Sequence, residues 1–190
     1  MGDRLFLFVD ESGQDTHGKL FLVGIVAIKD NPESYRVICE SAEQASGKAF
    51  TKWADSGVKV KLNYIGRILH EPAFIGCLFF ALFHDTKNYQ AATVETITRA
   101  LACIDSPASG ATVFIDALPK SNQQKIALDL RRMGTGVNKV RGIRRDENDS
   151  LIRLADSLCG LARMAHAGND DMQELLDWAI RSGAIRDLNK

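Results

Sequence analysis

Short apolar runs alternate with segments of helical spacing along most of this chain. Five runs predict β-strands, because each is short, contains β-branched or aromatic residues, and is bounded by turn-forming residues. They cover residues 5–9, 20–28, 77–84, 112–115 and 137–143. The run at 77–84 is also compatible with a helix end, and its aromatic side chains favour a strand. The first two runs predict a hairpin of adjacent strands.

Apolar residues three and four positions apart predict helices between and after these runs. The predicted helices cover residues 32–47, 62–69, 91–104, 121–133, 149–166 and 171–181. Strands come first and then alternate with helices, which predicts an α/β fold with a mixed sheet and helices on its faces. No repeat, low-complexity segment or proline-rich linker interrupts this order. We therefore expect one domain over residues 1–190, with a helical insertion at about 32–72 and a C-terminal helix at about 171–181.

Charge and apolar length narrow the classes of function. The 24 basic and 24 acidic residues balance, so no overall field attracts nucleic acid or an anionic membrane, and any polyanion site must be local. The chain begins directly with a short apolar run that is too brief for a signal peptide. The longest apolar stretch, residues 74–83, is about half as long as a membrane-spanning helix. We expect a cytoplasmic protein without a membrane segment.

The cysteines predict buried, reduced thiols rather than a disulfide framework or a zinc site. They are far apart, each inside an apolar run: Cys39, Cys77, Cys103 and Cys159. The histidines lack metal-site spacing, and no serine or cysteine stands in a nucleophile-elbow motif. The glycines form neither a dinucleotide-binding nor a Walker sequence. Triad hydrolysis and nucleotide binding by a glycine-rich loop are therefore not expected.

Carboxylates follow the ends of two predicted strands. Asp10 and Glu11 follow the first strand, and Asp116 follows the fourth. If these strands are neighbours, their ends lie about 5 Å apart, so Asp10 and Asp116 can share a cation. Hard oxygen ligands of this kind suit Mg²⁺ or Mn²⁺. Acidic residues also end strands simply as turn formers, and this alternative stays open.

The helix that begins near Asp149 carries a third acidic group. At about 100° per residue, Asp149, Asp156 and Gly160 lie opposite its apolar face. Taken alone, that side is typical of a solvated polar surface. Gly160, one turn beyond Asp156, favours a functional interpretation, because a missing side chain lets another backbone or a substrate come near.

Basic residues that could contact a phosphate are few. Lys52 lies in a Thr-Lys-Trp sequence, and Lys87 follows the aromatic run. The densest basic run directly precedes the acidic helix and comprises Lys139, Arg141, Arg144 and Arg145. Each of these side chains is equally compatible with an ordinary surface position.

Three stretches together resemble the bacterial domain-of-unknown-function family 3800. They are Phe8-Val-Asp-Glu-Ser-Gly13 with Phe21-Leu-Val-Gly-Ile25, Val113-Phe-Ile-Asp116, and Asp149-Ser-Leu-Ile-Arg-Leu-Ala-Asp-Ser-Leu-Cys-Gly160. Their order and spacing match across nearly the full chain. The family is regarded as ribonuclease-H-like, so the resemblance implies a central mixed five-stranded sheet flanked by helices. It also implies an acidic site at Asp10, Asp116 and Asp156, with Glu11 less certain.

The resemblance adds further candidates around that site. A lysine beside tryptophan after the second strand points to Lys52, and a lysine after the third points to Lys87. An aspartate-serine pair before the last helix is matched by either Asp146 or Asp149, which makes Asp149 a further candidate metal ligand. Arg153 stands where the family usually has glutamine. This departure places a cation near the proposed metal site, where it would favour phosphate binding or weaken metal binding.

These features predict a divalent-metal-dependent nuclease or phosphodiester hydrolase acting on nucleic acid. Asp10, Asp116 and Asp156 would hold Mg²⁺ or Mn²⁺, and Lys52, Lys87 or Arg145 would neutralise the phosphate. One alternative is a non-catalytic ribonuclease-H-like module that binds nucleic acid or a partner protein, for instance in a phage-defence or mobile-element system. A small-molecule phosphohydrolase also stays open.

Overall fold

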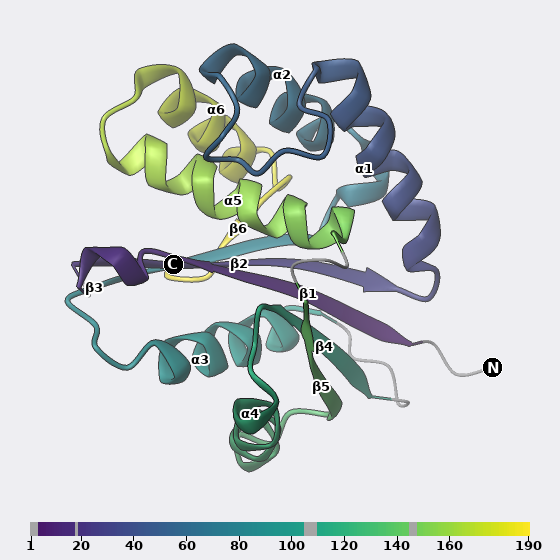
Figure 1. The fold of residues 1–190 in the computed structure, drawn as a ribbon, viewed down its shortest axis with the longest axis vertical. Coiled ribbons are helices and arrows are strands. Elements are labelled where there is room, and N and C mark those ends of the chain that lie inside the picture. The colour runs from purple at the N-terminus through teal and green to yellow at the C-terminus, as the bar shows by residue number, and fades with distance from the viewer. Residues whose placement is uncertain (1–3, 18, 105–109, 145–147) are drawn as a thin grey trace.

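A computed structural model describes residues 4–17, 19–104, 110–144 and 148–190 of the chain (Figure 1). Two residues named above, Arg145 and Asp146, lie outside these ranges. The substrate-binding role expected of Arg145 and the place of Asp146 in the acidic site stay predictions.

A mixed sheet of six strands, in the order β5-β4-β1-β2-β3-β6, forms the centre of the fold. Its strands are β1 (Leu5–Ser12), β2 (Leu20–Lys29), β3 (Leu78–His84), β4 (Ala111–Asp116), β5 (Val137–Ile143) and β6 (Arg186–Asp187). All five predicted strands are present, and the predicted hairpin is confirmed by the antiparallel pairing of β1 with β2. The expected count of five was wrong by one, because β6 has only two residues and pairs with the edge strand β3. A strand of two residues is too short to show an alternating pattern of apolar and polar residues in the sequence.

Helices cover both faces of this sheet. They are α1 (Pro32–Ser46), α2 (Val58–Leu69), α3 (Tyr89–Ala102), α4 (Lys120–Arg132), α5 (Ser150–His166) and α6 (Asp170–Arg181), with short 3-10 turns η1 (Gln14–Thr16) and η2 (Pro72–Phe74). Helix α5 lies directly on one face with α1, α2 and α6 beyond it, and α3 and α4 cover the other face (Figure 1). Each predicted helix is present, and α2 begins four residues earlier than its apolar spacing indicated. In the part of the chain that the structure describes, no helix combines the length and hydrophobicity that crossing a bilayer needs.

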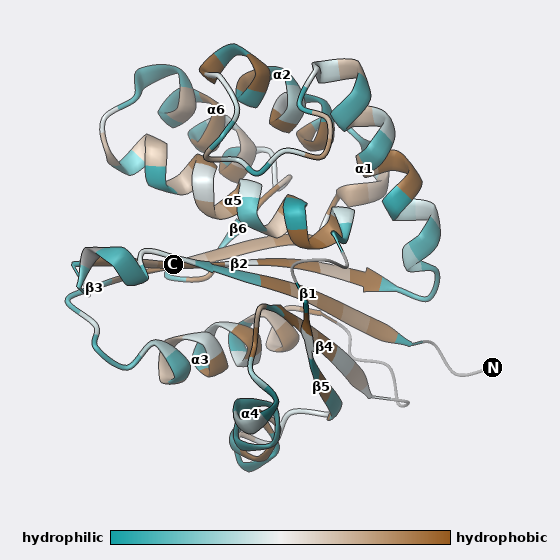
Figure 2. Cartoon of the chain, in the orientation of Figure 1, coloured by the Kyte–Doolittle hydropathy of each residue, from teal (hydrophilic) through white to brown (hydrophobic). Residues whose placement is uncertain are grey.

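Two apolar cores, one on each face, determine which way the side chains of β1 point. Phe8 belongs to the core that contains α5, whereas Leu7 and Val9 belong to the core that contains α3 and α4. The central strands β1 and β2 are accordingly largely hydrophobic (Figure 2). Because successive side chains alternate between faces, Asp10 continues the α5 face and Glu11 continues the α3 face. The two adjacent acids are thus directed to opposite sides of the sheet.

Helix α5 is buried on nearly all sides, so the expectation of a solvated polar side was wrong. Arg153 and Gly160, on the side expected to be polar, are buried, and Asp156 is half-buried. The outer helices and the segment between α1 and α2 cover this side. Trp53 from that segment occupies the space at Gly160, where an added Cβ would lie 2.2 Å from the indole ring. Gly160 therefore does admit a close neighbour, which is a side chain of the same chain.

The four cysteines are free thiols, as predicted. Cys39 and Cys159 are buried. The expectation that all four would be buried was wrong for Cys77, which is half-buried, and for Cys103, which is exposed just beyond the end of α3. Cys103 follows the last turn of its helix, where the apolar stripe has already ended.

Close packing at Gly24 sets the height of α5 above the sheet. Gly24 lies opposite Asp10 in the β1–β2 pairing. A Cβ built on Gly24 would lie 2.5 Å from the carbonyl oxygen of Ala155 and 3.0 Å from Sγ of Cys159. The thiol of Cys159 in turn donates to the carbonyl oxygen of Asp10 at 3.4 Å. The absence of a side chain at Gly24 therefore allows α5 to approach the strand that carries Asp10.

We expect Gly24→Ala to lower the free energy of unfolding by about 1–3 kcal/mol, because backbone carbonyls cannot yield as flexible side chains do. The measurement is urea denaturation followed by circular dichroism. Gly66→Ala in α2 is the matched control, since nothing lies within 4 Å of an added Cβ there. That control should be neutral or stabilising by up to about 1 kcal/mol. Equal effects of the two substitutions would contradict the packing argument.

Candidate active site

Parallel pairing brings Asp10 and Asp116 to the same end of the sheet. The register of β1 and β4 runs through Val9 opposite Ile115, so Asp10 and Asp116 are the next residues along the two strands. One pair earlier on the same face, the rings of Phe8 and Phe114 stack with centroids 5.1 Å apart. The condition under which Asp10 and Asp116 could meet, neighbouring strands, is therefore fulfilled, and both aspartates come two residues after a stacked aromatic pair.

Helix α5 adds Asp156 to these two aspartates. The three carboxylates line one small pocket of about 50 Å³ at the ends of β1, β4 and β5. The remaining lining residues are Lys52, Ile143, Arg144, Asn148, Asp149, Ile152 and Arg153. A volume of this size holds a few water molecules or a hydrated ion and is well below that of a typical small-molecule pocket, about 300–1,000 Å³. Any larger substrate must therefore lie across the mouth of the pocket.

Negative charge is concentrated in this pocket, although burial disfavours the ionised form of a carboxylate. Burial raises the pKa of Asp10 well above its ordinary value, and repulsion from Asp156 and then Asp116 raises it further. The backbone N–H of Glu11, which donates to Oδ1 of Asp10 at 2.9 Å, lowers this pKa in part, as does Lys52. Burial also raises the pKa of Asp156. The pocket thus lacks enough positive charge to balance its carboxylates.

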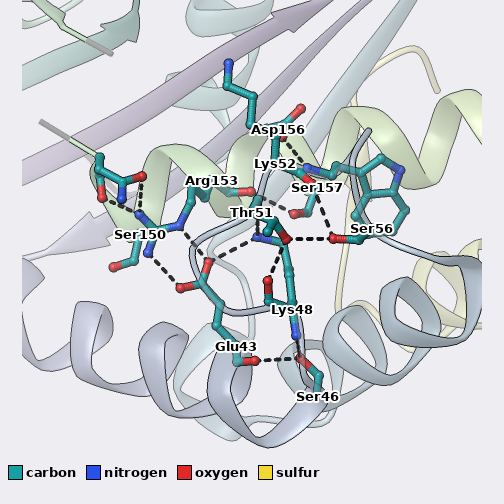
Figure 3. Close-up of polar contacts among 12 residues, drawn as sticks. Glu43, Ser46, Lys48, Thr51, Lys52, Ser56, Ser150, Arg153, Asp156 and Ser157 are labelled. Atoms are coloured by element: carbon teal, nitrogen blue, oxygen red, sulfur yellow. Dashed lines mark hydrogen bonds and ion pairs between the residues drawn. The ribbon is translucent and has the colours of Figure 1, made fainter. Parts of the chain in front are cut away.

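The segment between α1 and α2, residues 47–57, holds Asp156 in place. The backbone N–H of Trp53 donates to Oδ2 of Asp156 at 3.0 Å, which lowers the pKa of this carboxyl. Lys52 lowers the same pKa through its charge. The Lys52 and Asp156 side chains project to the same side of the segment, away from Lys48 and Glu43 (Figure 3). Lys52 is exposed and is thus a cation at the mouth of the acidic pocket.

Beneath this segment lies a buried ionic cluster that the sequence did not reveal. Glu43 accepts from Nε of Arg153 at 2.7 Å, from a terminal nitrogen of Arg153 at 2.7 Å, and from Nζ of Lys48 at 3.2 Å. Lys48 also donates to the carbonyl oxygen of Thr51 at 2.6 Å, and Arg153 donates to Asn148. The cluster therefore ties α1, α5 and the segment together (Figure 3).

Arg153 consequently differs from the freely available phosphate ligand that the sequence suggested. Its guanidinium is buried and makes a bidentate ion pair with Glu43, which faces it from α1. Part of Arg153 still lines the pocket. Its donors are already directed at Glu43 and Asn148, so its contribution to the pocket is structural support and positive charge.

Asp149 and Glu11, the two further candidate metal ligands, are both engaged elsewhere. Asp149 lines the pocket but caps α5 through Leu151 N–H at 2.9 Å and accepts two hydrogen bonds from Arg36. Glu11 accepts from Thr93 of α3 at 2.5 Å and from Gln14 at 2.9 Å. Burial raises the pKa of Glu11 while these two hydrogen bonds lower it. Glu11 does not line the pocket, in keeping with its direction on β1.

The structure brings some of the other basic candidates to the acidic pocket and places others away from it. Lys87 is exposed between β3 and α3 and does not line the pocket. Arg144, from the basic run, does line it, directly after β5. Lys52 is thus the lysine that the fold places beside the carboxylates. Lys87 follows β3, and β2 lies between β3 and β1, so Lys87 is two strand positions away from Asp10.

The carboxylates do not enclose an ion as they stand. Within residues 4–17, 19–104, 110–144 and 148–190, no group of three or more histidine, cysteine, aspartate or glutamate side chains could hold a metal ion. Three acids nevertheless share one pocket, and two of them have pKa values raised by burial and by repulsion from the others. Their chemistry, hard oxygens with excess negative charge, is that of Mg²⁺ or Mn²⁺ ligands.

Two solved structures share this arrangement of strands and helices. Ribonuclease HII of Archaeoglobus fulgidus, solved with PCNA, superposes with a TM-score of 0.51 and 15% identity over 96% of this chain and 91% of that one. Ribonuclease H2 of Pyrococcus horikoshii OT3 superposes with a TM-score of 0.50 and 12% identity over 90% of this chain and 75% of that one. This chain has a ribonuclease-H-like fold. No family model and no curated protein sequence matches it.

Within this ribonuclease-H-like fold, sequence reasoning missed residues that act through the backbone or from beneath the surface. The Trp53 N–H that fixes Asp156 carries no side-chain signal. Glu43 and Lys48 are buried charges on and just beyond a helix that was predicted only from its apolar spacing. A signal for them does exist, because Glu43 falls on the same side of α1 as the buried Cys39 four residues earlier.

We expect Asp10→Asn to raise Tm at neutral pH, because the raised pKa of Asp10 means that its ionised form opposes folding. Below the ordinary aspartate pKa of 3.8, Asp10 is protonated in the folded and unfolded states alike, so the difference should vanish. It should grow as pH rises from 3.8 through the raised pKa. Thermal unfolding followed by circular dichroism across this range measures it. Asp55→Asn, at an exposed aspartate, should show no such gain, and a destabilised Asp10→Asn would contradict the charge argument.

Proposed function

We propose that this protein is a divalent-metal-dependent nuclease that hydrolyses phosphodiester bonds of nucleic acid. The convergence of Asp10, Asp116 and Asp156 from two strands and a helix on one pocket carries the proposal. Their mutual repulsion, seen in the raised pKa of Asp10, is relieved by a cation. Isolated turn-forming or solvated acids have no reason to face one another in this way.

The residues that would hold Mg²⁺ or Mn²⁺ are Asp10, Asp116 and Asp156. Mg²⁺ usually keeps several waters and needs only one or two protein carboxylates, so the pocket does not have to be a closed cage. When bound, such an ion supplies activation of water and neutralisation of the leaving oxygen. Glu11 and Asp149 would support the site from outside it, since their oxygens already accept hydrogen bonds from other residues.

The chain itself provides positioning and charge at the phosphate. Trp53 N–H donates to Oδ2 of Asp156, and Oδ1 of the same carboxylate would be the metal-binding oxygen. Lys52, exposed at the mouth, would approach a phosphate oxygen and stabilise the charge that develops there. Because the pocket is small, it suits a phosphate that enters from a chain lying across the surface. Its size disfavours a small-molecule phosphohydrolase, whose substrate pocket typically measures about 300–1,000 Å³.

The likeness to two proteins named ribonucleases supports nucleic acid as the substrate class. The three sequence stretches that resemble domain-of-unknown-function family 3800 support membership of that family. The competing function is a non-catalytic module of this fold that binds nucleic acid or a partner protein. A module of that kind has no need for a divalent ion at these carboxylates, so metal binding separates the two.

We expect Asp116→Asn to weaken Mn²⁺ binding by about a hundred-fold or more and to abolish Mg²⁺-dependent cleavage of a labelled oligonucleotide. Asp10→Asn should behave alike. Calorimetric titration with Mn²⁺ and a gel-based cleavage assay are the two measurements. Asp171→Asn, on the exposed start of α6, is the control and should match the unmodified protein. Cleavage by Asp116→Asn at the unmodified rate would reject the assignment, and binding of nucleic acid without metal or cleavage would identify the non-catalytic alternative.

Lys52→Ala should lower kcat by about a hundred-fold and leave Mn²⁺ affinity unchanged or tighter, because it removes a charge at the phosphate and not a metal ligand. Steady-state cleavage kinetics and the same titration measure these effects. Lys59→Ala, an exposed lysine of α2, should change neither quantity. A Lys52→Ala protein with unchanged kcat would show that this lysine does not act on the substrate.

A further inference from the structure

The segment 47–57 is rigidly built although it has no helix or strand. Gly47 and Ala49 both take positive φ, at 79° and 50°. Thr51 bonds the carbonyl oxygen of Lys48 through its hydroxyl at 2.5 Å and contacts the Ser56 hydroxyl at 2.9 Å. Together with the buried cluster of Glu43, Lys48 and Arg153, these bonds fix the segment against α1 and α5 (Figure 3). Side chains that it presents to solvent are therefore held at a defined place.

Phe50 is the apolar side chain that this segment presents. It is 61% exposed, and its ring lies over the guanidinium of Arg153, with the carbon of that group 5.3 Å from the ring centre. Arg153 itself lines the acidic pocket, and Lys52, two residues after Phe50, lines it as well. Single exposed apolar residues are common on proteins and need no explanation. Phe50 differs from them because it lies against Arg153, which lines the pocket, and is followed two residues later by the exposed Lys52.

An exposed aromatic ring next to a lysine matches the chemistry of an unpaired nucleotide. A base stacks on the ring through its flat face, and the neighbouring phosphate pairs with the cation. A duplex offers no such face, because its bases already stack on one another within the helix. The arrangement therefore favours a single strand over a duplex.

We propose that Phe50 stacks an unpaired base of a single-stranded nucleic acid, next to the phosphate that Lys52 contacts at the acidic pocket. This inference rests on the proposed function for its substrate class and extends it to the strandedness of the substrate. It assigns to segment 47–57 the role of a binding surface outside the carboxylate pocket. RNA and DNA share the stacking chemistry, and separate arms of the experiment distinguish them.

The test measures binding without cleavage. In the full chain carrying Asp10→Asn, fluorescence anisotropy follows binding of a labelled single strand of about 12 nucleotides, as RNA and as DNA, and of the matching duplex. Adding Phe50→Ala should raise Kd for the preferred single strand about five- to one-hundred-fold, the range expected for stacking one base on an aromatic ring. Phe50→Trp should retain tight binding, since the indole is also a stacking surface. Duplex binding should respond little to either change.

Ile75→Ala is the matched control, because Ile75 is 68% exposed on another part of the surface and should leave Kd unchanged. Circular dichroism confirms that each variant is folded. Unchanged single-strand binding by Phe50→Ala, an equal loss in Ile75→Ala, or no binding of any single strand would each overturn the proposal. The nuclease function is judged separately, by cleavage with the unmodified protein. If Phe50→Ala weakens single-strand binding but the unmodified protein does not cleave, the nuclease function is rejected and the stacking role of Phe50 stands. If the unmodified protein cleaves but Phe50→Ala binds normally, the stacking role is rejected and the nuclease function stands.

Discussion

The close packing of α5 on β1 and β2 is the constraint on which the site depends. At Gly24 the backbone carbonyl of Ala155 occupies space that a Cβ would need, and Cys159 reaches the backbone of Asp10. Small residues on both partners let the helix descend until Asp156 faces the ends of the parallel strands. A larger residue at this contact would lift the helix and separate the carboxylates. The geometry of the pocket is therefore set by the absence of side chains as much as by their presence.

Bringing three carboxylates together in a buried pocket costs free energy, and the cations of the fold only partly offset this cost. Lys52 and the Trp53 N–H lower the pKa of Asp156, yet burial still raises it, and Asp10 lies well above its ordinary value. Buried negative charge that lacks balancing positive charge is common at functional sites, where a bound ion or substrate supplies the missing positive charge.

A buried ionic cluster connects this pocket to the surface that surrounds it. Glu43 receives both Arg153 and Lys48, and the latter holds the segment that carries Phe50, Lys52 and Trp53. Buried ion pairs contribute little net stability, because desolvation offsets most of their attraction. Their structural consequence here is position, since one carboxylate aligns α1, α5 and the segment at once. The same support therefore positions the residues that would contact substrate and, through α5 and the Trp53 N–H, the Asp156 carboxylate.

Local pattern alone determined a large part of this protein. The apolar runs and helical spacings located every described α-helix and every described strand longer than two residues, and the aspartates after the first and fourth strands were recognised as able to meet if those strands were neighbours, as they are. Because side chains alternate between the two faces of a strand, the direction of the Glu11 side chain follows from the sequence once the face of Phe8 is known. These features depend on residues close together in the chain, where periodicity of 2 or 3.6 residues specifies which side is apolar.

Tertiary structure decided the rest, because contacts between distant residues choose among side chains that look alike locally. Arg153 pairs with Glu43 from 110 residues away, and Asp149 pairs with Arg36 from 113 residues away, so neither is left free for a ligand. Lys52 reaches the pocket and Lys87 does not, although both are exposed lysines between regular elements. The polar side of α5 became interior because other helices cover it. Periodicity shows which faces of an element are alike, whereas only the assembled fold determines which neighbour each face meets.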